Sequence, residues 1–435
     1  MKIAVIGGGA AGLMTVATIH ELAPEAEIFL IERNNGLGKK VIISGGGRCN
    51  VTTGIRDVRM VLTKYPRGGK FLSSAMHWFP PQAVYEWFES RGVPLKIEDD
   101  LRVFPKSDNG KDIVGVFEKL FNTPRIHTLL NAHAISVKKT AHGFEIFLKG
   151  HDRPLIADAL VITTGGQAYR ATGSTGDGYA FALLLGHTIT SLAPSLNAFF
   201  TREKWPAEIS GLSFSKARFT ASCSDNPKEP HDTIRANCIK GRERSYVGPF
   251  LFTHKGVSGP AVFALSSLVA FEKYDAHHPL EIMIDLFPDL SIEKLTSDFM
   301  EKIKVNAKKS FANVVALFVP KSLAEIACRE LEFSDMLHAG EVGKKEATRI
   351  VSWLKAIPLH VTGRGAGDEF VTAGGVTLTE INPHTMESKM CPDLYFAGEI
   401  LDVDGYTGGF NLQASWAAGH VVGESIAEKI TGQKV

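Results

Sequence analysis

The sequence has little of what stabilises small secreted domains or holds metal ions. It contains five cysteines in 435 residues, and no two of them form a CxxC pair. This spacing excludes a zinc ribbon and a dithiol redox motif, and an odd, scattered set of cysteines is not a disulfide framework. A chain of this length also buries enough apolar surface to fold without such cross-links. We therefore expect a protein of the reducing cytoplasm that has no metal site.

Long apolar runs and an excess of charge are also absent. The longest apolar runs, such as VVALFV at 314–319, fall far short of the ~20 residues that cross a bilayer. Three consecutive glycines and the lack of a convincing cleavage site argue against a signal peptide at the start. The 48 Lys and Arg balance 47 Asp and Glu, so the formal net charge is +1. We expect neither a membrane nor a nucleic-acid partner, because the chain as a whole has no electrostatic drive toward either.

Glycine, by contrast, is abundant, with 42 residues gathered in clusters. The first cluster follows the apolar run KIAVI at 2–6 and precedes apolar residues at helical spacing over 10–23. A second apolar run, EIFLIE, occupies 27–32. This order predicts a strand, a turn, a helix and a strand, which is the βαβ unit that opens a parallel sheet.

Later patterns predict two insertions within one nucleotide-binding domain built from both ends of the chain. Short strand-like runs fill the first insertion, and helical patterns at 291–304 and 346–355 fill the second. Strand character returns after 357, and a long helix is expected from about Asn411 to Ile430. The expected boundaries are 1–190 and 357–435 for the nucleotide-binding domain, 191–287 for the β-rich insertion and 288–356 for the helical insertion.

The first glycine cluster fits the GxGxxG pattern with Gly7, Gly9 and Gly12. The first glycine permits a tight turn, the second lets the backbone approach a pyrophosphate, and the third lets the helix pack closely on the strand. The helix N-terminus then meets the negative charge of the pyrophosphate. Glu32 ends the second strand, where an acidic side chain accepts hydrogen bonds from ribose hydroxyls and repels a 2′-phosphate. These residues predict an ADP-binding site.

Three further features favour FAD over NAD. ISGGGRCN at 43–50 offers successive backbone N–H groups that form an anion-binding nest. LVITTGG at 160–166 follows a β-rich stretch, where many flavoproteins return to the FAD domain. The stretch 394–420 reads as a strand, an acidic turn and glycines that open a helix, whose positive end would face the flavin N1–C2=O edge. Because one domain is assembled from both termini, removal of the residues after about 390 is expected to abolish flavin retention.

These motifs resemble FAD-dependent flavoproteins that include L-aminoacetone oxidase and bacterial bile-acid ene-reductases. The resemblance covers nearly the whole chain, and GGGRCN and AGEILDVDGYTGGFN are its specific parts. Thr53 and Phe410 depart from it, since Asn and Tyr are common there. The resemblance implies an α/β, Rossmann-like FAD domain of two segments, a β-barrel-like insertion and a small helical insertion. Together the motifs and the resemblance assign these residues to FAD: Gly7, Gly9, Ala11, Gly12, Glu32, Arg33, Lys40, Gly45, Gly46, Arg48, Cys49, Asn50, Ala134, Thr164, Gly165, Gly398, Glu399, Gly408, Gly409, Phe410 and Asn411.

Three residues are candidates for binding the substrate, and no catalytic residue is assigned. Arg102 faces the flavin or an anionic substrate, or else ties down a loop. His254 is an acid or base near neutral pH, or else a bridge between domains. Tyr406 lies in the glycine turn and hydrogen-bonds the substrate, or else packs the turn.

The leading hypothesis is an FAD-dependent oxidoreductase that passes a hydride between flavin N5 and a small organic substrate, by amine oxidation or enone reduction. A tRNA-modifying flavoprotein and a non-catalytic FAD-binding sensor are the alternatives. Against the tRNA alternative, the basic residues of the helical insertion, such as Lys302 and Lys304, have the pattern of a solvated face. The segment GRGAGDEF at 363–370 lacks the third glycine and a following helix, so no second dinucleotide domain is expected. The redox partner is either O2 or an NAD(P)H that visits the open flavin.

Overall fold

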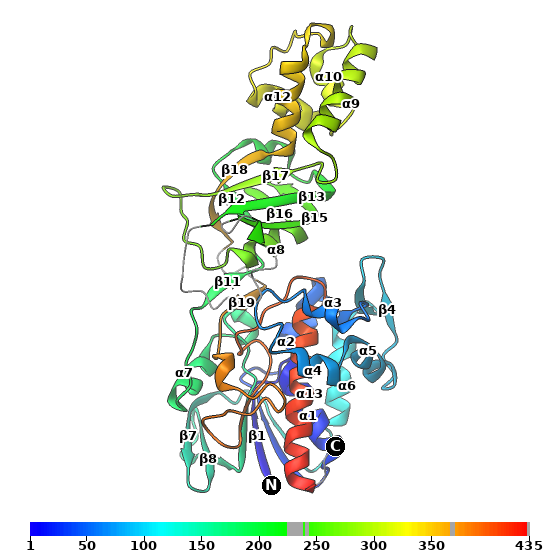
Figure 1. The fold of residues 1–435 in the computed structure, drawn as a ribbon. Helices are drawn as coiled ribbons and strands as arrows, with labels where there is room; N and C mark the ends of the chain where they lie inside the picture. Colours follow the sequence, from blue (N-terminus) through cyan, green and yellow to red (C-terminus); the bar gives the residue numbers. More distant parts are fainter. Residues whose placement is uncertain (224–237, 240–242, 366–369, 433–435) are drawn as a thin grey trace. The chain divides into compact units, whose positions relative to one another are not determined.

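The computed structural model describes residues 1–223, 238–239, 243–365 and 370–432 (Figure 1). The chain divides into two compact units. Unit 1 combines Met1–Ser195 with Gly367–Val435, and unit 2 is Leu196–Ala366. Within the described ranges, every helix is too short or too polar to traverse a lipid bilayer.

A five-stranded parallel sheet forms the centre of unit 1, in the order β20-β10-β1-β2-β6. Its strands are β1 (Lys2–Ile6), β2 (Glu27–Ile31), β6 (Ile126–Leu129), β10 (Ala159–Ile162) and β20 (Leu394–Phe396). The three middle strands are almost wholly buried and rich in Ile, Val and Leu, as is typical of a parallel sheet covered on both faces. Because β20 comes from the C-terminal segment, both ends of the chain build this sheet, as the glycine motifs predicted.

Helices α1 (Ala10–Leu22) and α13 (Phe410–Thr431) pack against each other in unit 1. Small residues permit the close approach, since a Cβ at Gly419 would lie 2.4 Å from the Ala11 carbonyl oxygen. A Cβ at Gly423 would lie 2.4 Å from Thr18 Cβ. The N-terminal and C-terminal segments are therefore joined by helix packing as well as by strand pairing.

Shorter elements surround this framework. Residues 36–50 form α2 and a 3₁₀ turn (Ser44–Gly47), and the strands β4 and β5 of a small sheet β3-β5-β4 lie among the helices of 70–121. The remaining elements of unit 1 are α2 (Lys39–Ile43), β3 (Thr52–Thr53), α3 (Val58–Leu62), α4 (Ser73–Trp78), α5 (Pro81–Glu89), β4 (Leu95–Ile97), β5 (Arg102–Pro105), α6 (Gly110–Leu120), β7 (Ala134–Thr140), β8 (Gly143–Leu148), β9 (Leu155–Ala157), α7 (Asp177–Leu184), β11 (Ala193–Ser195) and β19 (Val371–Ala373).

Unit 2 contains an antiparallel barrel. Six strands follow one another in the order β13-β17-β18-β12-β16-β15, and β15 pairs back onto β13, which closes the ring. The strands are β12 (Phe199–Thr201), β13 (Ser213–Ser222), β15 (Glu243–Thr253), β16 (Gly256–Ser258), β17 (Leu280–Asp285) and β18 (Ile357–Arg364), with β14 (Cys238–Ile239) at the edge. Closure leaves no open edge among the six strands. Helix α8 (Pro260–Leu268) packs on β13 and β15.

The helical part of unit 2 shares its core with the barrel. Its helices are α9 (Ile292–Val305), α10 (Phe311–Val315), α11 (Lys321–Glu330) and α12 (Lys344–Lys355). The predicted return to the first domain at 357 falls at the beginning of β18, which pairs with β12 and β17 inside unit 2, and unit 1 resumes at Gly367. The α/β class with a parallel Rossmann sheet and an inserted barrel is confirmed.

Candidate functional site

The first glycine turn lies at the carboxyl end of β1, where open α/β sheets bind their ligands. Gly7 has φ 112°, and a Cβ there would lie 2.5 Å from the Thr163 carbonyl oxygen. A Cβ at Gly12 would lie 2.0 Å from the Gly7 carbonyl oxygen, so only glycine lets α1 begin this close to the strand. A Cβ at Gly9, by contrast, meets nothing within 4 Å. The backbone at Gly9 is thus open to a ligand at the N-terminus of α1.

The Glu32 carboxylate anchors this turn from the end of β2. It accepts a hydrogen bond from Gly8 N at 2.8 Å, and two from the backbone N and the side-chain Nδ2 of Asn34 at 2.8 and 2.7 Å. A carboxylate has about four acceptor sites, so one is left for a ribose hydroxyl. Glu32 is 8% exposed, and it places a carboxylate at the carboxyl end of β2.

Arg33 lies beside Glu32 and belongs to a second polar group. Its Nη1 donates to Thr175 Oγ1 at 2.6 Å and to Asp177 Oδ2 at 2.8 Å, and His133 Nε2 lies 3.0 Å from the same Asp177 oxygen. Burial opposes the ionisation of Asp177, but the hydrogen bonds from Thr175 and His133 and the charge of Arg33 outweigh it and lower its pKa. Ala134 is buried at the beginning of β7, directly after His133.

The loop that follows α2 carries three consecutive glycines in the left-handed region. Gly45, Gly46 and Gly47 have φ of 58°, 73° and 90°, and a Cβ at either of the last two meets nothing within 4 Å. This geometry presents successive backbone N–H groups, as in an anion-binding nest. Cys49 follows at φ 62° and is fully buried, and burial raises the pKa of its thiol to about 12. The thiol is therefore protonated at neutral pH and is not a nucleophile.

Asn50 and Arg48 fix the same loop to β5. Asn50 Oδ1 accepts a hydrogen bond from Val103 N at 3.3 Å. The Arg48 guanidinium carbon lies 3.8 Å from the centre of the Phe104 ring, and its Nη1 donates to Glu98 at 2.7 Å. Both contacts hold the loop rather than leave a side chain free for a ligand.

The C-terminal glycine turn begins at the carboxyl end of β20. Gly398 has φ 82°, and the neighbouring Glu399 pairs with Lys40 at 2.8 Å, which joins this turn to α2. Gly408 and Gly409 have φ of 128° and 87°, and a Cβ at Gly409 would lie 2.2 Å from the Thr52 carbonyl oxygen. These glycines let α13 begin directly against β3.

Two residues at the beginning of α13 close the turn. Asn411 bonds both backbone groups of Gly405, accepting from its N–H at 2.8 Å and donating to its carbonyl oxygen at 2.7 Å. The Phe410 carbonyl oxygen accepts from Tyr65 Oη at 2.7 Å. The 22-residue helix α13 is thereby held rigidly, with its positive dipole end at the turn.

Two further predicted residues, Thr164 and Gly165, lie in the turn that follows β10. Gly165 has φ 73° at the carboxyl end of β10. Thr164 Oγ1 is buried without a hydrogen-bond partner, and a Cβ at Gly178 would lie 2.0 Å from it. The Thr164 side chain therefore packs against α7, and only its backbone remains for a ligand.

Sequence reasoning missed an ion pair that supports the C-terminal turn. Arg67 forms a two-pronged ion pair with Asp404, and Ser195 Oγ donates to the same carboxylate at 2.8 Å. Asp404 is fully buried. Because 337 residues separate the two charges, no local pattern marks them as partners. Thr163 was missed as well, although its Oγ1 donates to the Gly7 carbonyl oxygen at 2.9 Å and steadies the first turn.

The three substrate candidates do not gather in one place. Arg102 donates to Asp100 at 2.7 Å and to Glu98 at 3.2 Å, so carboxylates already hold its guanidinium. Tyr406 is 4% exposed, and its N–H donates to the Lys64 carbonyl oxygen at 2.9 Å. His254 belongs to unit 2, where it is exposed in the two-residue turn between β15 and β16.

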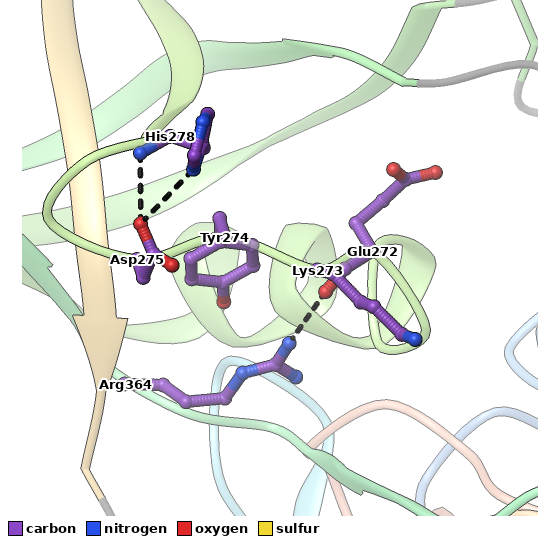
Figure 2. A pocket seen from close by; sticks show the side chains of 6 residues that line it. All are labelled: Glu272, Lys273, Tyr274, Asp275, His278 and Arg364. Carbon is purple, nitrogen blue, oxygen red and sulfur yellow. Dashed lines mark hydrogen bonds and ion pairs between the residues drawn. The ribbon is translucent and has the colours of Figure 1, made fainter.

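Unit 2 contains a polar pocket of about 470 Å³ that none of the predicted residues lines (Figure 2). Arg364 crosses it and donates to the carbonyl oxygens of Ala270 and Glu272 at 3.0 and 3.1 Å. Its guanidinium lies 4.7 Å from the centre of the Tyr274 ring. The Tyr274 hydroxyl is buried without a hydrogen-bond partner, and burial raises its pKa to about 12.

The glycine turns of unit 1 form one cradle along the carboxyl edge of the parallel sheet. The N-termini of α1 and α13 both open onto it, and Gly9, Gly46 and Gly47 leave space that any side chain would occupy. The donors present are backbone N–H groups and cations, which suit a pyrophosphate, and the Glu32 carboxylate is an acceptor, which suits ribose hydroxyls. These residues therefore fit a dinucleotide. Among the described residues, no group of three or more His, Cys, Asp or Glu is placed to hold a metal ion.

Comparisons with known proteins agree with this fold. A family model described as the HI0933-like protein Rossmann domain matches residues 1–425. The 3-dehydro-bile acid delta(4,6)-reductase of Clostridium scindens is 27% identical over 434 residues, which cover 98% of this chain and 99% of that protein. The ribosomal RNA dihydrouridine synthase of Escherichia coli is 27% identical over 417 residues, which cover 95% of each chain.

Among solved structures, the Mycobacterium smegmatis Sdh1 complex in the apo form matches with a TM-score of 0.50 and 14% identity. The match covers 99% of this chain and 68% of that one. At this identity the likeness shows the fold alone.

Proposed function

The chain belongs to the HI0933-like Rossmann family of flavoprotein oxidoreductases, and on this premise we propose that it is an FAD-dependent reductase of a carbon–carbon double bond conjugated with a carbonyl group. The observation that carries the proposal is the dinucleotide cradle of unit 1, built from the turns after β1 and β20. The names of two full-length relatives support the type of reaction. A steroid delta-reductase and a dihydrouridine synthase both saturate a conjugated double bond.

We assign FAD to the cradle with its adenosine near Glu32 and its flavin near the C-terminal turn. Gly7, Gly9 and Gly12 would receive the pyrophosphate at the N-terminus of α1, and Glu32 would accept from the adenosine ribose. Support comes from the open space at Gly9 and the free acceptor site of Glu32. The N-terminus of α13, held by Asn411, would stabilise negative charge on the flavin N1–C2=O edge.

When bound, FAD would supply a hydride from N5, with NAD(P)H as the reductant of the flavin. The net reaction would saturate the double bond with this hydride and one proton from solvent, and would convert NAD(P)H to NAD(P)⁺. The chain's part is to orient the carbonyl and to exclude water. Tyr406 is the proposed substrate contact in unit 1, because it follows the turn at Gly405 that Asn411 closes. Arg102 and His254 stay as substrate candidates.

The experiment begins with a visible spectrum of the purified protein and identification of the released flavin. Anaerobic protein reduced by NADPH or NADH is then mixed with a steroid enone or with aminoacetone. We expect flavin reoxidation by the enone and a product two mass units heavier. A flavin that the amine reduces and O2 reoxidises, without enone turnover, would identify an oxidase instead. The absence of turnover with every donor and acceptor would favour a sensor.

A second candidate substrate is uridine within RNA, which undergoes the same conjugate reduction. The observation in its favour is a group of exposed lysines in unit 2, at 302–309 and 344–345. It differs from the expectation of no nucleic-acid partner, which rested on the charge of the whole chain. Nuclease digestion and mass analysis of RNA incubated with the enzyme and NADPH would detect dihydrouridine, whereas RNA of unchanged mass would exclude it.

A further inference from the structure

Six exposed lysines gather at one end of the helical part of unit 2, which contains the helices labelled α9 and α12 in Figure 1. Two backbone hydrogen bonds join the loop after α9 to the segment before α12: Ala339 N donates to the Lys309 carbonyl oxygen, and Gly340 N donates to the Ala307 carbonyl oxygen, both at 2.9 Å. The last turn of α9, this loop and the first turn of α12 are therefore neighbours. The lysine end comprises Lys302, Lys304, Lys308, Lys309, Lys344 and Lys345.

The charge of the lysine end is not neutralised by ion pairs with described carboxylates. Three other lysines of unit 2 do form ion pairs: Lys216 with Asp289 at 2.6 Å, Lys294 with Asp298 at 2.6 Å and Lys321 with Glu325 at 3.7 Å.

Two of the three carboxylates in the segments 301–309 and 338–346 are engaged by backbone groups instead. Glu341 accepts from His338 N at 3.0 Å, and Glu346 accepts from Gly343 N at 3.1 Å; the third is Glu301. Six lysines against three carboxylates leave a local excess of +3 within a chain whose formal net charge is +1.

The shape and composition of the lysine end indicate what kind of anion fits it. The segments 301–310 and 334–346 contain no Phe, Tyr or Trp, so they lack the stacking platform that single-stranded nucleic acid uses. The apolar face of α9 is occupied, because Leu295, Phe299 and Ile303 are buried in the core. Two apolar side chains of these segments, Val305 and Met336, are exposed, which is far less apolar surface than the face of a membrane-binding helix presents. The phosphates of a folded, double-helical RNA can bind such a group of lysines, and this binding needs neither aromatic side chains nor an apolar face.

We propose that the lysine end docks the phosphate backbone of a folded RNA. This inference rests on the RNA candidate of the proposed function and adds the surface that recognises it. Helix α12 has 12 residues and leads directly into β18, so the lysine end lies about 18 Å from the barrel strand along the helix axis. Phosphate contacts there supply affinity and orientation, and the reading of the base is left to another part of the protein.

The test measures binding of a labelled stem-loop RNA to the full-length flavoprotein, without reductant, by fluorescence anisotropy at several salt concentrations. One variant, called the tip variant, changes three residues of the lysine end: Lys304→Gln, Lys308→Gln and Lys309→Gln. The matched control carries Lys216→Gln, Lys294→Gln and Lys321→Gln, and so removes the same formal charge from paired lysines. We expect the tip variant to bind about tenfold more weakly, with a log K against log salt slope shallower by about 2 to 3. The control keeps the wild-type affinity within about twofold.

Equal weakening in both variants would overturn the proposal, because it would report net charge rather than a docking surface. Unchanged RNA binding by the tip variant would also overturn it. The proposal would also be overturned if the tip variant lost binding to phosphatidylserine vesicles but kept its binding to RNA, because the surface would then be a membrane contact. Turnover of a free enone is measured separately, so RNA docking without RNA reduction would refute the RNA candidate and leave the docking surface standing.

Discussion

Glu32 connects the first glycine turn to the ribose end of the proposed cofactor site. We expect Glu32→Ala to weaken FAD binding by about ten- to a hundredfold, because hydrogen bonds to a charged group contribute about 1.5–3 kcal/mol. FMN lacks the adenosine ribose, so its affinity should stay unchanged. Flavin fluorescence titration of the apoprotein measures both.

The control for Glu32 is Glu25→Ala, an exposed carboxylate just before β2 that should leave both affinities as they are. Equal loss of FAD and FMN in Glu32→Ala would contradict the ribose assignment. It would show instead that the Gly8 and Asn34 bonds shape the whole site.

Burial of the Cys49 thiol should make the free energy of unfolding fall as the pH rises above 9. Its pKa is raised by burial from the ordinary 9.0 to about 12, so the folded protein keeps the thiol protonated where the unfolded chain has ionised it. The stabilisation is complete below pH 9 and is lost as pH rises from 9 toward 12, by up to about 1.4 kcal/mol per pH unit.

Urea unfolding at pH 8, 9 and 10 tests this sign. The free energy of unfolding should fall more steeply with pH in the wild type than in Cys49→Ala, since other groups titrate equally in both. Parallel pH profiles would show that the thiol is not buried as the structure has it.

At the scale of elements, the contact of α1 with α13 holds the two chain segments of unit 1 together. Gly419→Ala would place a Cβ 2.4 Å from the Ala11 carbonyl oxygen, so the helices must separate. Overpacking of this kind costs about 1–3 kcal/mol. We expect a lower free energy of unfolding and a weaker retention of flavin, because α13 begins at the glycine turn.

Gly115→Ala in α6 is the matched control for this substitution. A Cβ there meets nothing within 4 Å, so the change should stabilise the helix by about 0.5–1 kcal/mol. Chemical unfolding compares the two variants, and an equal response would mean that α1 and α13 are not in close contact.

At the scale of the whole molecule, the number of dinucleotide-binding motifs determines how tightly NAD(P)H is expected to bind. GxGxxG followed by a helix occurs once in the sequence, at the cradle that we assign to FAD. No fixed pyrophosphate cradle is therefore expected for NAD(P)H, and its binding should be weak. In stopped-flow reduction, the observed rate should stay linear in NADPH well beyond low-micromolar concentrations. Saturation at low-micromolar NADH or NADPH would reveal a nicotinamide site that the sequence pattern does not show.

The sequence by itself determined the features that short-range physics specifies. The strand before Gly7, the helix that begins after Gly9 and the acidic end of β2 follow from local periodicity and from glycine's freedom at positive φ. The assembly of unit 1 from both termini was also predictable, because each terminal segment carries its own strand, glycine turn and helix. The positions of α8 and of the strands β3 and β4 were not foreseen, since short apolar runs do not distinguish helix from strand.

Only the tertiary structure decided which distant residues meet. The pairing of Arg67 with Asp404 and the closure of β15 onto β13 join residues with no local signal for each other. The sequence left open whether Arg102 binds a ligand or ties down a loop, and the fold supplies its guanidinium with the carboxylates of Asp100 and Glu98. The lysines of α9 seemed a solvated face, and folding brings Lys344 and Lys345 beside them. Charge and periodicity can be read directly from the sequence. The partner of a side chain, however, depends on the packing of elements that are distant in sequence.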